Sequence, residues 1–233
     1  MQNYVRWVFW TDYNDMNNYT LYGNPETPIC LLRLTGEHEK ELIEYELAWL
    51  RENCGETGWC VAYIPVEDWE NDLVPWKRQP DGTSETATGA DATLNRIVDG
   101  VINDISSHCQ AGTQRYYLAG YSLAGLFALW ASYQTDTFAG IAAVSPSVWY
   151  PGWMEYAAEH KCLTSNIYLS LGSKEHKTRN KLMSCVRDNI TALHASLLEK
   201  GFNTVLEFNE GNHFTDPGKR ITKGIKWLLE NDK

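Results

Sequence analysis

The sequence contains no apolar run that approaches the ~20 residues needed to cross a membrane. Its first residues also lack the basic segment and apolar core of a secretory signal peptide. Positive charge is scarce, because 20 Lys and Arg residues face 30 Asp and Glu residues and give a formal net charge of −10. This balance disfavours nucleic acid and anionic membranes as partners. We therefore expect a cytoplasmic protein with no nucleic-acid or membrane partner, and the sequence leaves its oligomeric state open.

Cysteine pairs with metal-ligand spacing are also missing. The chain has six cysteines, none in a C-x-x-C arrangement, and Cys30 and Cys60 lie in apolar runs typical of strands. This pattern favours buried free thiols over a disulfide framework or a zinc site. We expect neither a metal nor an organic cofactor.

Strand and helix patterns alternate from residue 28 to the end of the chain, without internal repeats or low-complexity tracts. Strands are expected at residues 28–34, 59–64, 115–120, 139–144, 166–171 and 204–208, with an outer strand at 4–10. Helices are expected at residues 37–53, 91–108, 178–200 and 217–230, with another following Gly125. This order predicts an α/β fold with a mainly parallel sheet covered by helices on both faces, forming a single domain over residues 1–233. Its active site should lie at the carboxyl ends of the strands.

Residues 65–90 show no periodicity and contain two tryptophans, three prolines and an Asp-Gly turn. A loop of this length inside a compact domain is usually functional or mobile. We expect it to lie near the active site.

The segment Gly120-Tyr-Ser122-Leu-Ala124-Gly125 joins an apolar strand to an apolar helix. It fits the nucleophile elbow G-x-S-x-G, except that Ala124 occupies the second glycine position. The elbow needs small residues because neighbouring backbone passes close to a strained serine, and alanine has the smallest side chain. The alternative interpretation is a glycine-rich turn with a solvent-facing serine.

A serine nucleophile needs a histidine base and an orienting acid, in the chain order serine, acid, histidine. Among the six histidines, His213 is the one that follows the last expected strand in a glycine-containing loop. Glu175 follows the preceding strand, where its carboxylate could orient His213. The alternatives are a surface-loop histidine, a glutamate at a helix start, and the other acids Asp188, Glu207 and Glu210.

Acyl transfer also requires hydrogen-bond donors for the developing oxyanion. The backbone N–H of Leu123 is the first candidate, because it begins the helix after Ser122. The second donor normally comes from the loop after an earlier strand, here Thr35 and Gly36.

Bulky aromatic residues are frequent in two loops, and they are the candidate walls of a substrate pocket: Trp69, Trp76, Trp149, Tyr150 and Trp153. They would suit an apolar or aromatic acyl or alcohol group. The alternative is that most of them cap the sheet edge. Lys174, Lys177 and Arg179 either hold an anionic substrate group or are solvated charges.

Four segments together resemble an esterase group of the α/β-hydrolases that includes the enterochelin esterases and esterase D. They are residues 120–125, 144–149, 171–175 and 211–214, which are similar to the elbow, post-strand loop, acid turn and histidine turn of that group. The resemblance implies a three-layer α/β-hydrolase fold with Ser122, Glu175 and His213 as catalytic triad. We therefore predict a serine hydrolase acting on a small-molecule carboxylic ester through an acyl-enzyme. Acyl transfer or thioester cleavage on the same triad, and a non-catalytic binding domain, are the alternatives.

Overall fold

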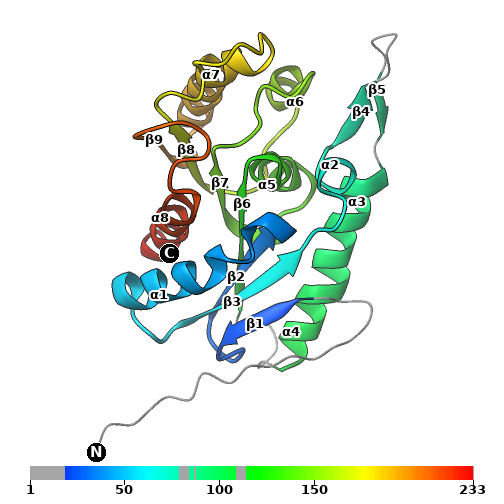
Figure 1. Ribbon diagram of the computed structural model, residues 1–233. Helices are drawn as coiled ribbons and strands as arrows, with labels where there is room; N and C mark the ends of the chain where they lie inside the picture. Colours follow the sequence, from blue (N-terminus) through cyan, green and yellow to red (C-terminus); the bar gives the residue numbers. More distant parts are fainter. Residues whose placement is uncertain (1–18, 79–83, 87, 109–113, 233) are drawn as a thin grey trace, which may run out of the picture.

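The computed structural model describes residues 19–78, 84–86, 88–108 and 114–232, which contain a seven-stranded sheet with helices on both faces (Figure 1). The strands are β1 (Thr20–Gly23), β2 (Ile29–Thr35), β3 (Trp59–Pro65), β6 (Arg115–Tyr121), β7 (Phe138–Val144), β8 (Asn166–Gly172) and β9 (Asn203–Asn209). They are arranged in the order β1-β3-β2-β6-β7-β8-β9. Only the edge strand β1 runs antiparallel to its neighbour within this sheet. The predicted mainly parallel sheet is confirmed.

Two of the described helices cover one face of the sheet, and a larger group of them covers the other (Figure 1). The first face carries α1 (Leu42–Cys54) and α8 (Pro217–Glu230). The second carries α3 (Thr88–Asn95), η2 (Arg96–Ile102), α4 (Asn103–Ser107), α5 (Leu123–Gln134), α6 (Trp153–Glu159) and α7 (Val186–Glu199). The three-layer arrangement expected from the resemblance is therefore present.

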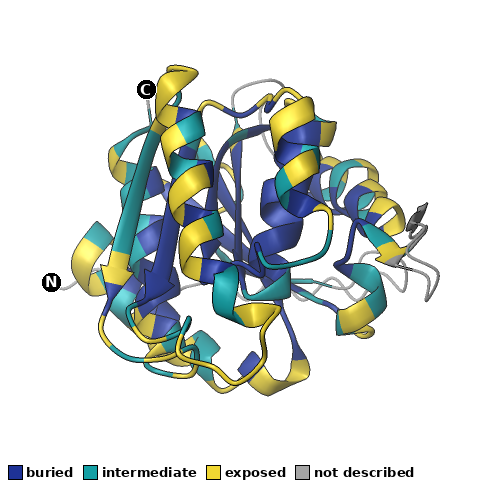
Figure 2. Cartoon of the chain, turned by 90° about the horizontal axis from the view of Figure 1, so that it is seen from above, coloured by how far each residue is buried: buried dark blue, intermediate teal, exposed yellow. Residues whose placement is uncertain are grey.

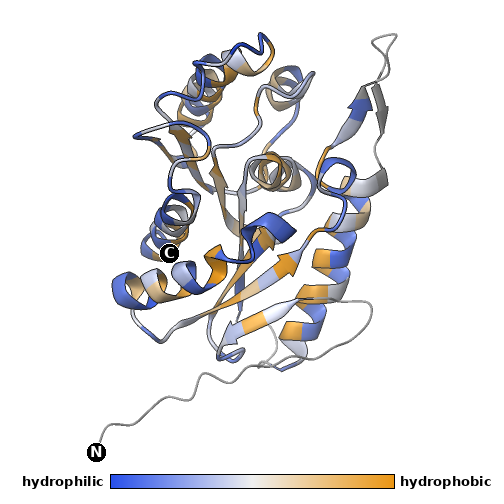
Figure 3. Ribbon diagram, in the orientation of Figure 1, coloured by the Kyte–Doolittle hydropathy of each residue, from blue (hydrophilic) through white to orange (hydrophobic). Residues whose placement is uncertain are grey.

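The middle strands and α5 are buried almost throughout, as Figure 2 shows. Strands covered on both faces need apolar residues at nearly every position, which explains why β2 and β7 contain continuous apolar runs. Outer helices need only one apolar face, and hydrophobic residues alternate with hydrophilic ones along α1 and the helix that starts at α3 (Figure 3).

Strand order reverses between β2 and β6, since β3 lies on one side of β2 and β6 on the other. Open parallel sheets bind ligands at such a switch point, beyond the carboxyl ends of the strands. Ser122 directly follows β6 and therefore lies at this position.

Most predicted elements are confirmed, including the helix over residues 217–230 with unchanged bounds. The predicted strand at residues 4–10 and Cys109 lie outside the described residues. Outside residues 65–90, the elements β1 and α6 were not predicted. β1 is only four residues long, and α6 follows a Pro-Gly pair within an aromatic segment, so neither presents a full period of apolar residues.

The helix expected from residue 178 starts only at Val186, after the short helix η3 (Met183–Cys185). Local hydrogen bonds hold the intervening chain in turns. The Asn180 side-chain oxygen accepts from the backbone N–H of Leu182 at 3.0 Å, and the Thr178 hydroxyl accepts from the N–H of Asn180 at 3.2 Å. Such side-chain acceptors compete with helix formation.

The prediction of one structureless loop over residues 65–90 was wrong. This segment contains α2 (Trp69–Asp72), the paired short strands β4 (Trp76–Arg78) and β5 (Ser84–Thr86), and the start of α3. Each piece is too short to show periodicity. The Asp68 carboxylate, which accepts from the N–H of Asn71 at 3.2 Å, is the capping signal that identifies α2.

The described cysteines are all free thiols, and three of them, Cys30, Cys60 and Cys162, are buried. Among the described residues, no helix is both long and apolar enough to span a bilayer.

Candidate active site

Ser122 lies in a strained turn between β6 and α5. Its φ of 59° and ψ of −118° are unusual for a residue with a side chain, and its hydroxyl projects from the start of the helix. Strain of this kind costs about 1–3 kcal/mol and persists only where the surrounding structure fixes it. Here the Ser122 N–H donates to the Val144 carbonyl at 3.1 Å, and the Ser122 carbonyl accepts from the Ser147 N–H at 3.1 Å.

The tight positions of the elbow are Gly120 and Gly125. A Cβ at residue 120 would lie 2.2 Å from the Ala124 carbonyl oxygen, and one at residue 125 would lie 3.1 Å from the Gly120 oxygen. Ala124, by contrast, fits its site with its side chain fully buried. The departure from G-x-S-x-G therefore falls at a position that accommodates a methyl group.

Three side chains from separate loops form one hydrogen-bonded series. His213 Nε2 lies 3.1 Å from Ser122 Oγ, and His213 Nδ1 lies 2.8 Å from Glu175 Oε2. An ionised carboxylate can only accept, so Nδ1 carries the hydrogen and the neutral ring presents Nε2 as acceptor to the serine hydroxyl. Glu175 follows β8 and His213 follows β9, as the sequence order predicts.

Glu175 is buried, with 5% of its side chain exposed, and its second oxygen is also saturated with donors. Oε1 accepts from the Ser145 hydroxyl at 2.7 Å, the Gly172 N–H at 2.6 Å and the Arg220 Nη1 at 3.1 Å. Burial raises the pKa of Glu175, but the hydrogen bonds from His213, Ser145 and Gly172 outweigh it and lower the pKa below its ordinary value. The carboxylate is thus held ionised.

Three residues of this network were not predicted: Tyr121, Ser145 and Arg220. Ser145 directly follows the strand β7 and has a positive φ of 45°. The Tyr121 hydroxyl donates to the His213 carbonyl at 2.6 Å. Arg220 could have been noticed, because residues four apart share one helix face and Arg220 is a charged residue on the same buried face of α8 as Gly224. Nothing in the sequence distinguishes Ser145 or Tyr121 from core residues.

The oxyanion donors are only partly as predicted. Leu123 is the first residue of α5, and the first N–H groups of a helix have no intrahelical acceptor, so its N–H is directed outward beside Ser122. The assignment of Gly36 was wrong, because its N–H donates to Glu39 Oε2 at 3.1 Å. Thr35 is buried, and its carbonyl accepts from Val66 N–H at 2.9 Å. The N–H of Gly36 is thus engaged with a side chain of its own loop, while the role of Thr35 as a donor stays a prediction.

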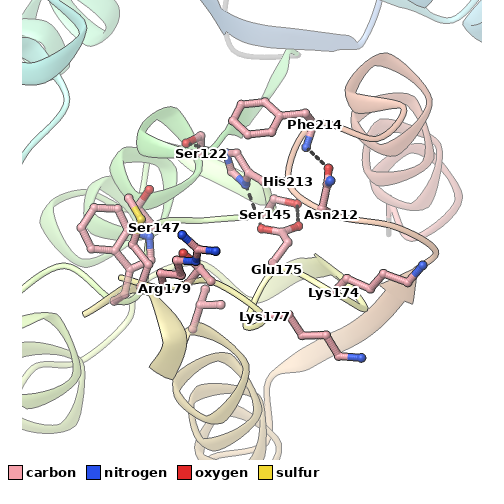
Figure 4. Close-up of a pocket in the computed structure, with 14 residues that line it drawn as sticks. Ser122, Ser145, Ser147, Lys174, Glu175, Lys177, Arg179, Asn212, His213 and Phe214 are labelled. Atoms are coloured by element: carbon pink, nitrogen blue, oxygen red, sulfur yellow. Dashed lines mark hydrogen bonds and ion pairs between the residues drawn. The ribbon is translucent and has the colours of Figure 1, made fainter. Parts of the chain in front are cut away.

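A cavity of about 540 Å³ opens at the hydrogen-bonded series (Figure 4). Its apolar lining consists of Trp149, Met183, Val186 and Phe214. Lys174, Lys177 and Arg179 also line it, but their charged ends differ in direction. Arg179 extends towards Ser147, whereas Lys174 and Lys177 extend away from Ser122 (Figure 4).

Of the five predicted pocket aromatics, the structure places only Trp149 in this cavity's lining. The prediction for Trp153 was wrong, because it is fully buried in the core. Trp76 packs against Tyr156 with ring centroids 5.2 Å apart, and its indole N–H donates to the Pro151 carbonyl at 2.8 Å. Tyr150 donates to the Trp76 carbonyl, and Trp69 packs against His38. Trp69, Trp76 and Tyr150 therefore pack against the hydrophobic core and are not part of the cavity lining.

The described part of the chain contains no group of three or more His, Cys, Asp or Glu side chains that could hold a metal ion.

No protein-family model matches the chain. It is 27% identical over 124 residues to the uncharacterized protein YbbA of Bacillus subtilis (strain 168). That match spans 50% of each chain, so it covers half the length of this curated relative.

Comparison with solved structures identifies the fold. The siderophore hydrolase EstA from Aspergillus nidulans matches with a TM-score of 0.67 and 22% identity over 92% of this chain and 91% of that one. The enterobactin esterase FES from Shigella flexneri matches at TM-score 0.66 and 16% identity, over 98% of this chain and 60% of that one. An alpha-beta serine hydrolase homologue from Coxiella burnetii matches at TM-score 0.56 and 13% identity, over 92% and 90%.

This chain therefore has the α/β-hydrolase fold. Within that fold its structure is similar to that of an enterobactin esterase, as the four sequence segments indicated.

Proposed function

We propose that this protein hydrolyses a carboxylic ester, with Ser122 as nucleophile, His213 as general base and acid, and Glu175 as the group that orients His213. The observation that carries the proposal is the series Glu175–His213–Ser122, with joining distances of 2.8 and 3.1 Å, at the mouth of a cavity. The similarity of the fold to a siderophore hydrolase, an enterobactin esterase and a serine hydrolase homologue supports it.

In the proposed reaction, Ser122 Oγ attacks the ester carbonyl carbon while its proton passes to His213 Nε2. The Leu123 N–H stabilises the negative charge that develops on the carbonyl oxygen. His213 then gives the proton to the departing alcohol oxygen as the carbon–oxygen bond breaks, leaving an acyl-Ser122. Water repeats the sequence, with His213 taking its proton, and releases the carboxylic acid.

The cavity lining defines the class of substrate that we propose. Trp149, Met183 and Val186 offer apolar surface, and Arg179 is the charged side chain of the lining that extends towards Ser147. An ester with an apolar or aromatic part and an anionic group matches both features. The chain has a net charge of −10, so most of its surface repels an anionic substrate. The positive charge of Arg179 would offset that repulsion at the cavity.

A fluorophosphonate probe followed by peptide mapping tests the nucleophile. We expect labelling of Ser122 in the wild-type chain, no labelling in Ser122→Ala, and release of acid from an ester panel that includes anionic members. Adding competing alcohols and thioesters to the same assay separates hydrolysis from acyl transfer and thioester cleavage. Neither labelling nor turnover in a folded wild-type chain would refute the proposed activity and favour a binding domain.

A further inference from the structure

Arg220 is a buried arginine that contacts both the loop carrying His213 and the carboxylate of Glu175. Only 2% of its side chain is exposed. Its Nη1 lies 3.1 Å from Glu175 Oε1, and its Nη2 donates to the carbonyls of Glu210 and Asn212, both at 2.9 Å. One planar guanidinium therefore spans two loops that follow different strands.

The contacts of Glu175 are divided between its two oxygens. Oε1 receives Arg220 together with the Ser145 hydroxyl and the Gly172 N–H, while Oε2 faces His213. With three donors on one oxygen, rotation of the carboxylate would break several hydrogen bonds at once. The position of Oε2, which orients His213, is consequently fixed by the hydrogen bonds that Oε1 accepts.

The backbone of the histidine loop is held in the same way. Arg220 binds the carbonyls of Glu210 and Asn212, and Tyr121, whose hydroxyl lies 3.3 Å from Arg220 Nη1, binds the carbonyl of His213 itself. These acceptors lie at His213 and in the three residues before it. A shift of the arginine would therefore be transmitted to the imidazole and to the carboxylate together.

The neighbouring backbone also leaves room for this arrangement. A Cβ on Gly172 would lie 2.7 Å from Glu175 Oε1, 2.8 Å from the Gly211 carbonyl and 2.9 Å from Arg220 Nη1. Gly172 has an ordinary φ, so its lack of a side chain serves this close approach and no special backbone conformation. The guanidinium occupies a site that only a glycine at this position leaves open.

We propose that Arg220 is a positioning residue that holds His213 and Glu175 in line with Ser122 and partly neutralises the carboxylate facing the imidazole. The proposal rests on the proposed function. It requires arginine in particular, because the fork of the guanidinium serves the carboxylate with one nitrogen and the loop carbonyls with the other. A lysine supplies the charge but only a single nitrogen.

The test compares Arg220→Gln and Arg220→Lys with the wild type in two measurements. The first is kcat and KM for a small neutral ester, per active site titrated with a fluorophosphonate. The second is the NMR titration of the His213 ring. Arg220 is not among the residues that line the cavity, so we expect an unchanged KM. We expect kcat to fall about 10- to 100-fold in both variants, the cost of a small misplacement of catalytic groups.

The titration separates charge from geometry. Loss of the positive charge in Arg220→Gln leaves Glu175 unneutralised and favours the imidazolium, so the midpoint of the His213 titration should rise by about 0.5–1 pH unit. Arg220→Lys should keep the wild-type midpoint. The cations that line the cavity, Lys174, Lys177 and Arg179, are the same in every variant.

Arg115→Gln is the matched control. Arg115 also forms an ion pair, with Asp232, but at the start of β6 and away from the residues of the cavity. It should leave kcat and the His213 midpoint unchanged even if it lowers thermal stability.

A wild-type kcat or an unchanged His213 midpoint in Arg220→Gln overturns the proposal. If that variant does not fold, Arg220→Lys decides, because a wild-type kcat there contradicts the need for the fork. The NMR titration requires no turnover. A wild-type chain inactive on every ester would therefore refute the proposed function, while the midpoint in Arg220→Gln would still decide the role of Arg220.

Discussion

Replacing Glu175 with glutamine tests the orienting role most sharply, because the substitution changes one atom and keeps the shape. The amide must present NH₂ on one side and oxygen on the other. At the Oε1 position the NH₂ would face the Gly172 N–H and Arg220, neither of which can accept a hydrogen bond. The NH₂ is therefore expected to face His213.

This orientation reverses the histidine. A donor facing Nδ1 makes that nitrogen the acceptor, so the ring hydrogen moves to Nε2. Nε2 then cannot accept the proton of the Ser122 hydroxyl. A wrong tautomer in a serine hydrolase triad costs about 10,000-fold in kcat. That factor corresponds to about 5 kcal/mol of transition-state stabilisation.

The assay is kcat/KM on an ester series together with the rate of fluorophosphonate labelling, for Glu175→Gln and for Glu207→Gln. Glu207 is a suitable control because it follows the same pattern of an ion-paired carboxylate, bound to Lys223 and Tyr168, without contacting His213. The control should retain wild-type rates. Activity of Glu175→Gln within about tenfold of wild type would refute the tautomer argument, and a large loss in Glu207→Gln would move the role to that residue.

Three further predictions follow from the same contacts. Gly120→Ala places a Cβ 2.2 Å from the Ala124 oxygen and should lower the free energy of unfolding by about 2 kcal/mol or more in a denaturant titration. The control Ala124→Gly should lower it by about 1 kcal/mol. Equal effects of the two substitutions would contradict the elbow geometry. Arg179→Gln should raise the KM for an anionic ester about tenfold and leave the KM for its neutral isostere unchanged. Because the ammonium of Lys177 extends away from Ser122, Lys177→Gln should change neither KM. Because the pKa of Glu175 is lowered by folding, its ionised form stabilises the protein above about pH 4.5, and that contribution is lost as the pH falls through the folded-state pKa. Wild type should therefore lose more stability on acidification below pH 4.5 than Glu175→Gln, and parallel curves would argue against the shift.

The parallel order of the strands could be predicted because buried strands such as β7 are apolar at nearly every position and the intervening helices are regular. The same logic placed Ser122, Glu175 and His213 at carboxyl ends of strands, and the structure brings their side chains within hydrogen-bonding distance. Their catalytic roles stay predictions. Chain order and strand ends are properties that a sequence pattern reports well.

Predictions that depended on side-chain direction succeeded less often. Trp153 and Trp149 lie four residues apart in one aromatic segment, yet one is fully buried and the other lines the cavity. The N–H of Gly36 is used by Glu39, a contact set by a buried ion pair of Glu39 with Arg33. The position of Arg220 on the buried face of α8 could have been noticed, but the local sequence does not indicate which distant carboxylate the arginine binds. These contacts depend on tertiary packing.

The position of β9 at the edge of the sheet makes the site sensitive to partial unfolding. Within the part of the chain that the structure describes, β9 pairs with β8 alone, and most of its residues are incompletely buried. Opening of this strand with the loop that follows would remove His213, while the Ser122 elbow stayed anchored in the middle of the sheet. Labelling of Ser122 by a fluorophosphonate should consequently disappear at a lower denaturant concentration than the folding signals of the central strands. The reactivity of Ser122 would then measure the stability of β9, a strand that does not neighbour it.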